Sequence, residues 1–169
     1  MNPAGDGFLK ELFQQMEEEI LYYHLLAEEM KKESEYLRKG SMNSLMESLQ
    51  FLEIHTTEIR KIHESIHISI EKILSTMEGK EGKNDLSGLL PLLPPQDSQR
   101  IKDYQRSLGA LKKRIAQINA RNKTFIQESM AYLRDLFSLL TQPAAESPLY
   151  IQNGKTQFST LPISLNRKV

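Results

Sequence analysis

The feature that most constrains this chain is a strict heptad spacing of mostly apolar residues between Gly40 and Gly79. Steps of four and three residues connect Leu45, Leu49, Leu52, Thr56, Ile59, His63, Ile66, Ile70, Ile73 and Met77. A repeat of 3.5 residues keeps one narrow stripe of an α-helix turned toward a partner helix, as in left-handed coiled coils. The spacing therefore predicts a long helix over residues 41–78 that packs against other helices.

Apolar residues at helical spacing predict two further long helices, at about residues 7–39 and 97–142. Gly40 is placed to end the first helix in a left-handed conformation, and Ser41 to cap the second. Asp97 or Ser98 is placed to cap the third. In the connection, residues 85–93 predict a short capped helical turn that folds over the end of the bundle.

Charge also relates the first and third helices. Nine acidic and five basic residues lie between Asp6 and Lys39, whereas residues 97–142 contain nine basic and four acidic residues. Opposite net charges favour a side-by-side arrangement of the two helices. We therefore expect an all-α fold, an elongated antiparallel three-helix bundle with coiled-coil packing over residues 1–142. Residues 143–169, rich in Pro, Ser, Gln, Asn and Gly without a regular apolar period, predict a mobile C-terminal tail.

Composition excludes several classes of function. Acidic and basic residues balance at 22 each, so net charge does not favour nucleic acid or anionic membranes. No cysteine is present, which removes disulfides and thiolate metal sites. The first thirteen residues lack the apolar core of a signal peptide, and no segment approaches the ~18 apolar residues of a membrane span. We expect a cytoplasmic protein without membrane insertion, cofactor or small-molecule substrate.

One short motif points to metal chemistry. The segment His63-Glu64-Ser65-Ile66-His67 matches H-E-x-x-H, which on a helix places two imidazoles on one face to hold zinc, with the glutamate as the base. A catalytic site also needs a third protein ligand and a substrate cleft, and the continuation lacks the expected glycine. We therefore keep a zinc peptidase only as an alternative.

Other catalytic patterns are incomplete. Glu64-x-x-His67 resembles half of a di-iron carboxylate motif, but no second Glu-x-x-His occurs. No nucleophile elbow and no phosphate-binding glycine loop is present. We assign no catalytic residue and no metal ligand, and we expect that the protein is not an enzyme.

Two polar residues occupy positions of the predicted apolar seams, His63 in the second helix and Asn122 in the third. A polar residue at such a position specifies the register of a coiled coil at a cost in stability.

C-terminal to Asn122 the apolar face of the third helix widens beyond a single seam. It comprises Phe125, Ile126, Met130, Tyr132, Leu133, Leu136, Phe137, Leu139 and Leu140. Two interpretations remain open: all three helices meet here and bury this face, or the face is exposed and accepts a helix of a partner.

Three segments of the chain resemble the FlgN family of flagellar type III export chaperones. The first is the turn Leu37-Arg38-Lys39-Gly40-Ser41, and the second is the leucine-rich connection at 86–91. The most specific runs from Gln117 through Asn119, Asn122 and the apolar face to Tyr150-Ile151-Gln152-Asn153-Gly154-Lys155.

The resemblance implies a concrete function. Members of the family bind terminal helical segments of hook-associated (hook–filament junction) proteins, prevent their premature assembly and deliver them to the export apparatus. It implies cargo-binding residues on the third helix, Phe125, Met130, Leu133, Leu136, Phe137 and Leu140. It also implies that Tyr150 docks to components of the export gate or its ATPase. A structural coiled-coil subunit that forms a homo-oligomer is the second interpretation.

Overall fold

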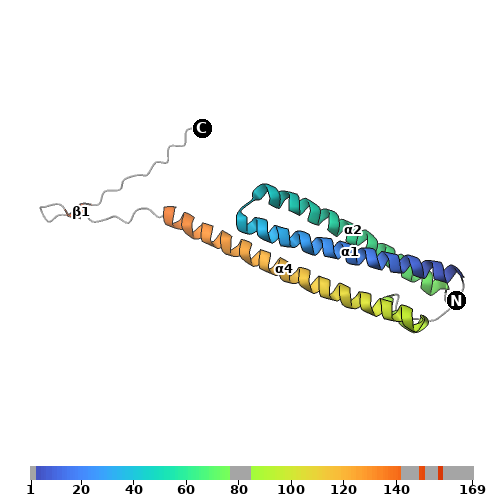
Figure 1. Ribbon diagram of the computed structural model, residues 1–169. Coiled ribbons are helices and arrows are strands. Elements are labelled where there is room, and N and C mark those ends of the chain that lie inside the picture. Colours follow the sequence, from blue (N-terminus) through green and yellow to red (C-terminus); the bar gives the residue numbers. More distant parts are fainter. Residues whose placement is uncertain (1–2, 77–84, 142–148, 151–155, 158–169) are drawn as a thin grey trace. The chain divides into compact units, whose positions relative to one another are not determined.

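The computed structural model describes residues 3–76, 85–141, 149–150 and 156–157 (Figure 1). Its elements are α1 (Pro3–Lys39), α2 (Met42–Thr76), α3 (Leu86–Leu89), the 3-10 helix η1 (Leu90–Leu92) and α4 (Pro95–Thr141). Two short strands follow, β1 (Leu149–Tyr150) and β2 (Thr156–Gln157). The long elements are all helical, so the predicted all-α class is confirmed. No helix in the described ranges has a stretch apolar and long enough to cross a membrane.

The chain divides into two compact units, Met1–Ile126 and Gln127–Val169, with the division inside α4. Strands β1 and β2 of the second unit pair antiparallel, with Leu149 opposite Gln157 and Tyr150 opposite Thr156. The sequence contained no signal for this pair. The remaining residues of the predicted mobile tail lie outside the described residues, so its mobility stays a prediction.

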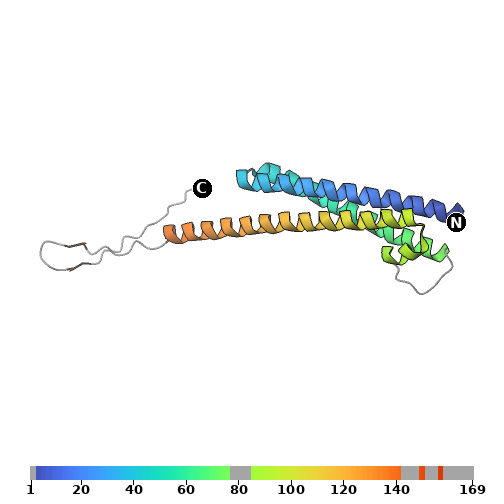
Figure 2. The same ribbon diagram turned by 60° about the horizontal axis from the view of Figure 1, so that its bottom comes forward.

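A tight turn at Gly40 joins α1 to α2, which lie side by side in antiparallel directions (Figures 1 and 2). The Gly40 N–H donates to the Leu37 carbonyl at 3.4 Å, and the Ser41 N–H to the Tyr36 carbonyl at 3.1 Å. Gly40 has φ of 67°, the left-handed region. Together these features form a Schellman motif, which satisfies two of the last carbonyls of α1. The predicted role of Gly40 is confirmed.

Replacement of two glycines by alanine should change the stability of the protein in opposite directions. We expect Gly40→Ala to lower the free energy of unfolding by about 1 kcal/mol, because a β-carbon is unfavourable at positive φ. Gly109 lies inside α4, and a β-carbon there would meet no atom within 4 Å, so Gly109→Ala should raise stability by about 0.5–1 kcal/mol. Urea unfolding monitored by circular dichroism measures both changes. Shifts of the same sign would contradict this account.

The apolar core of the first unit gathers where the start of α1, the end of α2, the connecting segment and the start of α4 meet. Its buried members are Leu9, Leu12, Phe13, Met16, Ile62, Ile66, Ile70, Ile73, Leu89, Leu93, Ile101 and Tyr104. Leu89 is fully buried in this core, so the connecting segment packs against the long helices.

The buried stripe of α2 differs from the predicted seam. Side chains that are buried or half-buried at steps of four and three are Ser48, Leu52, His55, Ile59, Ile62, Ile66, Ser69 and Ile73. Of the predicted series, Ile59, Ile66, Ile70 and Ile73 are buried and Leu45 and Leu52 half-buried. Leu49, Thr56 and His63 are exposed, and Met77 lies outside the described residues. Small polar residues can occupy this buried stripe because their side chains form hydrogen bonds. Ser69 Oγ, for example, donates to Gln15 Oε1 at 2.9 Å.

Helix α4 begins two residues before the predicted cap Asp97. Pro95 occupies the first helical position, where its missing N–H is unpaired in any helix. Ser98 does not cap α4. Its hydroxyl instead donates to the carbonyls of Leu90 (2.9 Å) and Leu93 (3.3 Å), which ties the start of α4 to η1.

Within the first unit, α4 contacts α1 through charged and polar side chains. Arg100 pairs with Glu17 and Arg114 with Glu28, each at 3.2 Å. The Arg100 guanidinium also stacks 3.8 Å from the centre of the Phe13 ring. These contacts confirm that the acidic first helix lies beside the basic third. Because the pairs are exposed, each contributes only ~0–1 kcal/mol.

Candidate protein-binding surface

The C-terminal third of α4 carries a continuous apolar face. Along the helix, Ile126, Met130, Leu133, Phe137 and Leu140 follow steps of four and three, which places them on one line. A second line, about 100° away around the helix, contains Phe125, Tyr132, Leu136 and Leu139. We call these nine residues the α4 apolar face.

All nine residues of the α4 apolar face are exposed, from 37% for Leu136 to 81% for Leu140. The six predicted cargo-binding residues, Phe125, Met130, Leu133, Leu136, Phe137 and Leu140, all belong to it. Their exposure favours the interpretation in which this face accepts a helix of a partner. Single exposed apolar residues are common on proteins, but a contiguous face of this kind is typical of an interaction site.

Asn122 marks the change from the buried to the exposed part of α4. Its side chain is 5% exposed, and every side chain from Lys123 to Thr141 is exposed except the half-buried Ser129. The Asn122 Oδ1 accepts from Ser34 Oγ at 2.6 Å, while Nδ2 donates to Glu33 Oε2 at 3.1 Å and to the Met30 carbonyl at 3.4 Å. Asn122, the predicted polar core position, is thus buried, and its hydrogen bonds to described residues all go to α1.

His63, the other predicted polar core residue, is not in the core. Its side chain is 51% exposed, and the neighbouring Ile62 takes the buried position. The seam was misplaced at this position because adjacent helical positions differ by 100° and both carry residues compatible with a heptad.

The polar residue actually buried at this level is Glu19 of α1, with no exposed surface. Its carboxyl group accepts a hydrogen bond from the Tyr104 hydroxyl of α4 and lies 3.3 Å from His63 Nδ1 of α2. Glu19 therefore connects the three long helices of the first unit. Sequence reasoning missed it because it lies in a run of three glutamates, Glu17 to Glu19, that resembles a solvated helix start.

Burial, and then the hydrogen bond to Glu19, raises the pKa of Tyr104 far above its ordinary value. Above about pH 10 the unfolded chain loses this proton while the folded chain keeps it. Stability should therefore fall as pH rises, and between pH 9 and 11 the parent protein should lose about 1.4 kcal/mol more than Tyr104→Phe. Urea unfolding between pH 9 and 11, compared between the two proteins, tests this expectation. Equal slopes would contradict it.

The H-E-x-x-H motif does not assemble a metal site among the described residues. The rings of His63 and His67 contact each other edge to face, with centroids 4.8 Å apart. Within the described ranges, no group of three His, Asp or Glu residues is placed to hold an ion. The arrangement therefore gives no support to a zinc peptidase.

Comparison with known families shows the family to which the chain belongs. The family model described as FlgN protein matches residues 1–157. The chain belongs to the FlgN family. This match covers the Gly40 turn, the α4 apolar face and the Tyr150 segment, and it confirms the resemblance drawn from the sequence. No curated protein and no solved structure matches the chain.

Membership of the FlgN family indicates a role as a flagellar export chaperone, with partners among flagellar proteins. It is a family of chaperones rather than of enzymes. Tyr150, the residue predicted to dock to the export gate, lies in β1, where it pairs with Thr156.

Proposed function

We propose that this protein is a cytoplasmic type III export chaperone for hook-associated proteins. It binds their terminal helical segments, prevents premature assembly and delivers them to the export apparatus. The observation that carries this proposal is the exposed α4 apolar face, found in a chain that belongs to the FlgN family. The proposal assigns the protein a binding function without a catalytic step.

The chemistry of the α4 apolar face suits an amphipathic helix. Residues spaced along two adjacent lines of a helix form a surface against which a partner helix can lay its apolar side. Removing apolar area from water contributes about 25 cal/mol per Å², although ordering of the partner reduces the net affinity. Met130, 55% exposed, adds an unbranched, adaptable side chain that can fit different cargo residues.

We further propose that the three long helices pack as an antiparallel coiled-coil bundle over the first unit. The alternation of buried residues in α2 at steps of four and three supports this packing. Asn122 would set the register of α4 against α1, because a shift by one position would leave its buried amide without the partners on α1. In this proposal Tyr150 serves as the docking residue for the export gate.

Co-purification tests the proposed function. The full chain is expressed with hook-associated proteins from the same genome, with and without their terminal helices, and complexes are sized by chromatography with mass analysis. We expect a discrete complex that disappears when the cargo's terminal helices are deleted. A stable homo-oligomer that captures no hook-associated protein would instead favour a structural coiled-coil subunit, in which the α4 apolar face is a permanent self-interface.

A further inference from the structure

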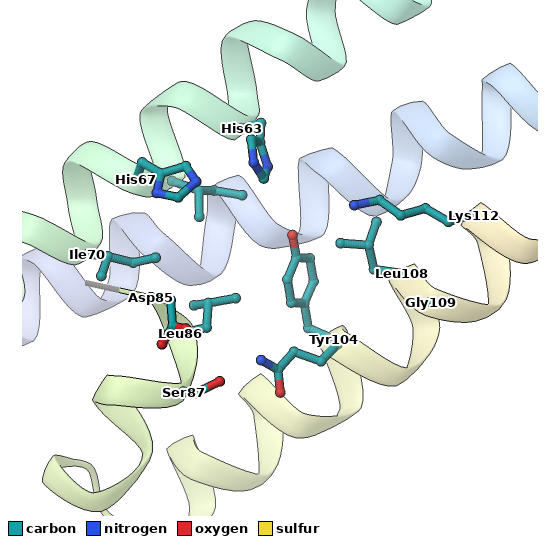
Figure 3. Close-up of a pocket in the computed structure, with 12 residues that line it drawn as sticks. His63, His67, Ile70, Asp85, Leu86, Ser87, Tyr104, Leu108, Gly109 and Lys112 are labelled. Atoms are coloured by element: carbon teal, nitrogen blue, oxygen red, sulfur yellow. The ribbon is translucent and has the colours of Figure 1, made fainter. Parts of the chain in front are cut away.

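A second candidate binding site lies in the first unit and shares no residue with the α4 apolar face. It is an open pocket of about 330 Å³ between α2, the segment at Asp85–Ser87 and α4 (Figure 3). Ile66, Ile70, Leu86 and Leu108 provide its apolar lining. Its volume is near the lower end of ligand sites, which suits one side chain with a polar group rather than a cofactor.

The pocket carries one cation, Lys112, and several groups that can both donate and accept hydrogen bonds. Lys112, His67 and Gln105 line it, and within the described part of the chain none of them has a hydrogen-bond or ion-pair partner. The Lys112 ammonium lies 5.5 Å from the centre of the Tyr23 ring, a distant cation–π contact. His63 Nδ1 lies 3.3 Å from Glu19 Oε1.

Two carboxylates lie near these groups, and both already accept hydrogen bonds. Asp85 Oδ1 accepts the Gly88 N–H at 2.9 Å as the cap of α3, and the buried Glu19 accepts from the hydroxyl of Tyr104. Figure 3 shows Lys112 and Asp85 on opposite sides of the pocket. The pocket is thus polarised, with its cationic group at the α4 side and Asp85 at the connecting segment.

Gly109 provides an independent indication that the pocket is kept open. It lies in the interior of α4 and lines the pocket, although glycine destabilises a helix interior relative to alanine. No atom lies within 4 Å of the position that its β-carbon would take. The missing side chain leaves space at the pocket beside Lys112 rather than relieving a close packing contact.

We propose that this pocket binds an acidic peptide segment of a partner protein, with an apolar side chain on the isoleucine and leucine lining and an adjacent carboxylate at Lys112. An acidic segment is favoured over a basic one because Lys112 has no ion-pair partner among the described residues, whereas both nearby carboxylates already accept hydrogen bonds. The site is distinct from the cargo surface, so the chaperone would hold two protein ligands.

The test uses the full chain, labelled with ¹⁵N, and a blocked tripeptide of glutamate, leucine and glutamate. We expect a saturable chemical-shift change at the Gly109 amide and at the imidazoles of His63 and His67, in the millimolar range typical of such small ligands. The matched tripeptide with glutamine in place of glutamate should bind about fivefold more weakly, and Lys112→Gln should remove this difference. Equal affinity for the two tripeptides, or no saturable shift at Gly109, would overturn the proposal.

Two substitutions of Gly109 distinguish an effect of filling the pocket from an effect of misfolding. Gly109→Leu should weaken tripeptide binding at least about tenfold by filling the pocket, whereas Gly109→Ala should change it less than about twofold. Both variants should remain folded, with an unchanged helical circular dichroism spectrum. Unaltered binding by Gly109→Leu would exclude this pocket. Capture of hook-associated proteins is measured in parallel and should be unaffected by either variant, so failure here is distinguishable from failure of the proposed function.

Discussion

Replacement of both Phe137 and Leu140 with serine abolishes capture of a hook-associated protein, with an expected loss of affinity of at least about 100-fold. Both side chains are largely exposed in the free chain, at 66% and 81%, so a bound partner helix would remove most of their surface from water. Burial of one such side chain contributes about 1.5–3 kcal/mol, and 1.4 kcal/mol corresponds to a tenfold change in affinity. Isothermal titration of purified cargo into each protein measures the effect.

The matched control is Ile68→Ser, which removes an apolar side chain that is 51% exposed on α2. This variant should bind cargo within about twofold of the parent, because exposed apolar residues outside an interface contribute little. The helical circular dichroism signal and the unfolding midpoint should be unchanged in both variants. Unfolding of the Phe137 and Leu140 variant would show that these residues belong to a core and would contradict the proposed surface.

Tyr104→Phe lowers the free energy of unfolding by about 1–3 kcal/mol at neutral pH, because the buried Glu19 carboxyl loses its hydrogen-bond donor. The substitution removes one oxygen and leaves the ring, so a cavity contributes little to the loss. Tyr132→Phe is the matched control. Its side chain is 65% exposed, and the same chemical change there should stay within about 0.5 kcal/mol. Urea unfolding at pH 7 gives both values.

A second substitution tests whether the loss arises at Glu19. In the background of Tyr104→Phe, Glu19→Leu should recover stability, because a buried polar pair replaced by apolar residues of similar volume is often neutral or stabilising. The double-mutant cycle isolates the coupling between the two side chains. If Tyr104→Phe has no effect, or if Glu19→Leu adds to its cost, the Glu19 contact does not contribute to stability.

Residues of the candidate surface were predictable because they depend on local spacing alone. Phe125, Met130, Leu133, Leu136, Phe137 and Leu140 repeat at helical intervals after Asn122, and nothing between them interrupts the helix. What remained open was whether other helices cover them. Exposure depends on which segments pack nearby, a property that no local pattern contains.

The predicted seam of α2 is buried at Ile59, Ile66, Ile70 and Ile73 but not at His63, which shows the limit of reading apolar periodicity. Ile62 and His63 are adjacent, and the flanking isoleucines fit a heptad through either one. The structure buries Ile62, whereas His63 remains half exposed with its Nδ1 3.3 Å from Glu19 Oε1 on α1. Partner residues on another helix decide between two stripes that the sequence leaves nearly equivalent.

By itself, the sequence determined the all-α class, the Gly40 turn, the capped segment at Asp85 and the pairing of an acidic with a basic helix. The turn and the cap follow from backbone conformational preferences, which act over a few residues. The pairing of the two helices follows from charge, which acts over whole helices. Only the tertiary structure decided which face of α2 is buried, that Glu19 joins three helices, and that the α4 apolar face stays uncovered. Such choices depend on the fit of side chains from distant segments, where small differences in packing select one arrangement among several of similar local energy.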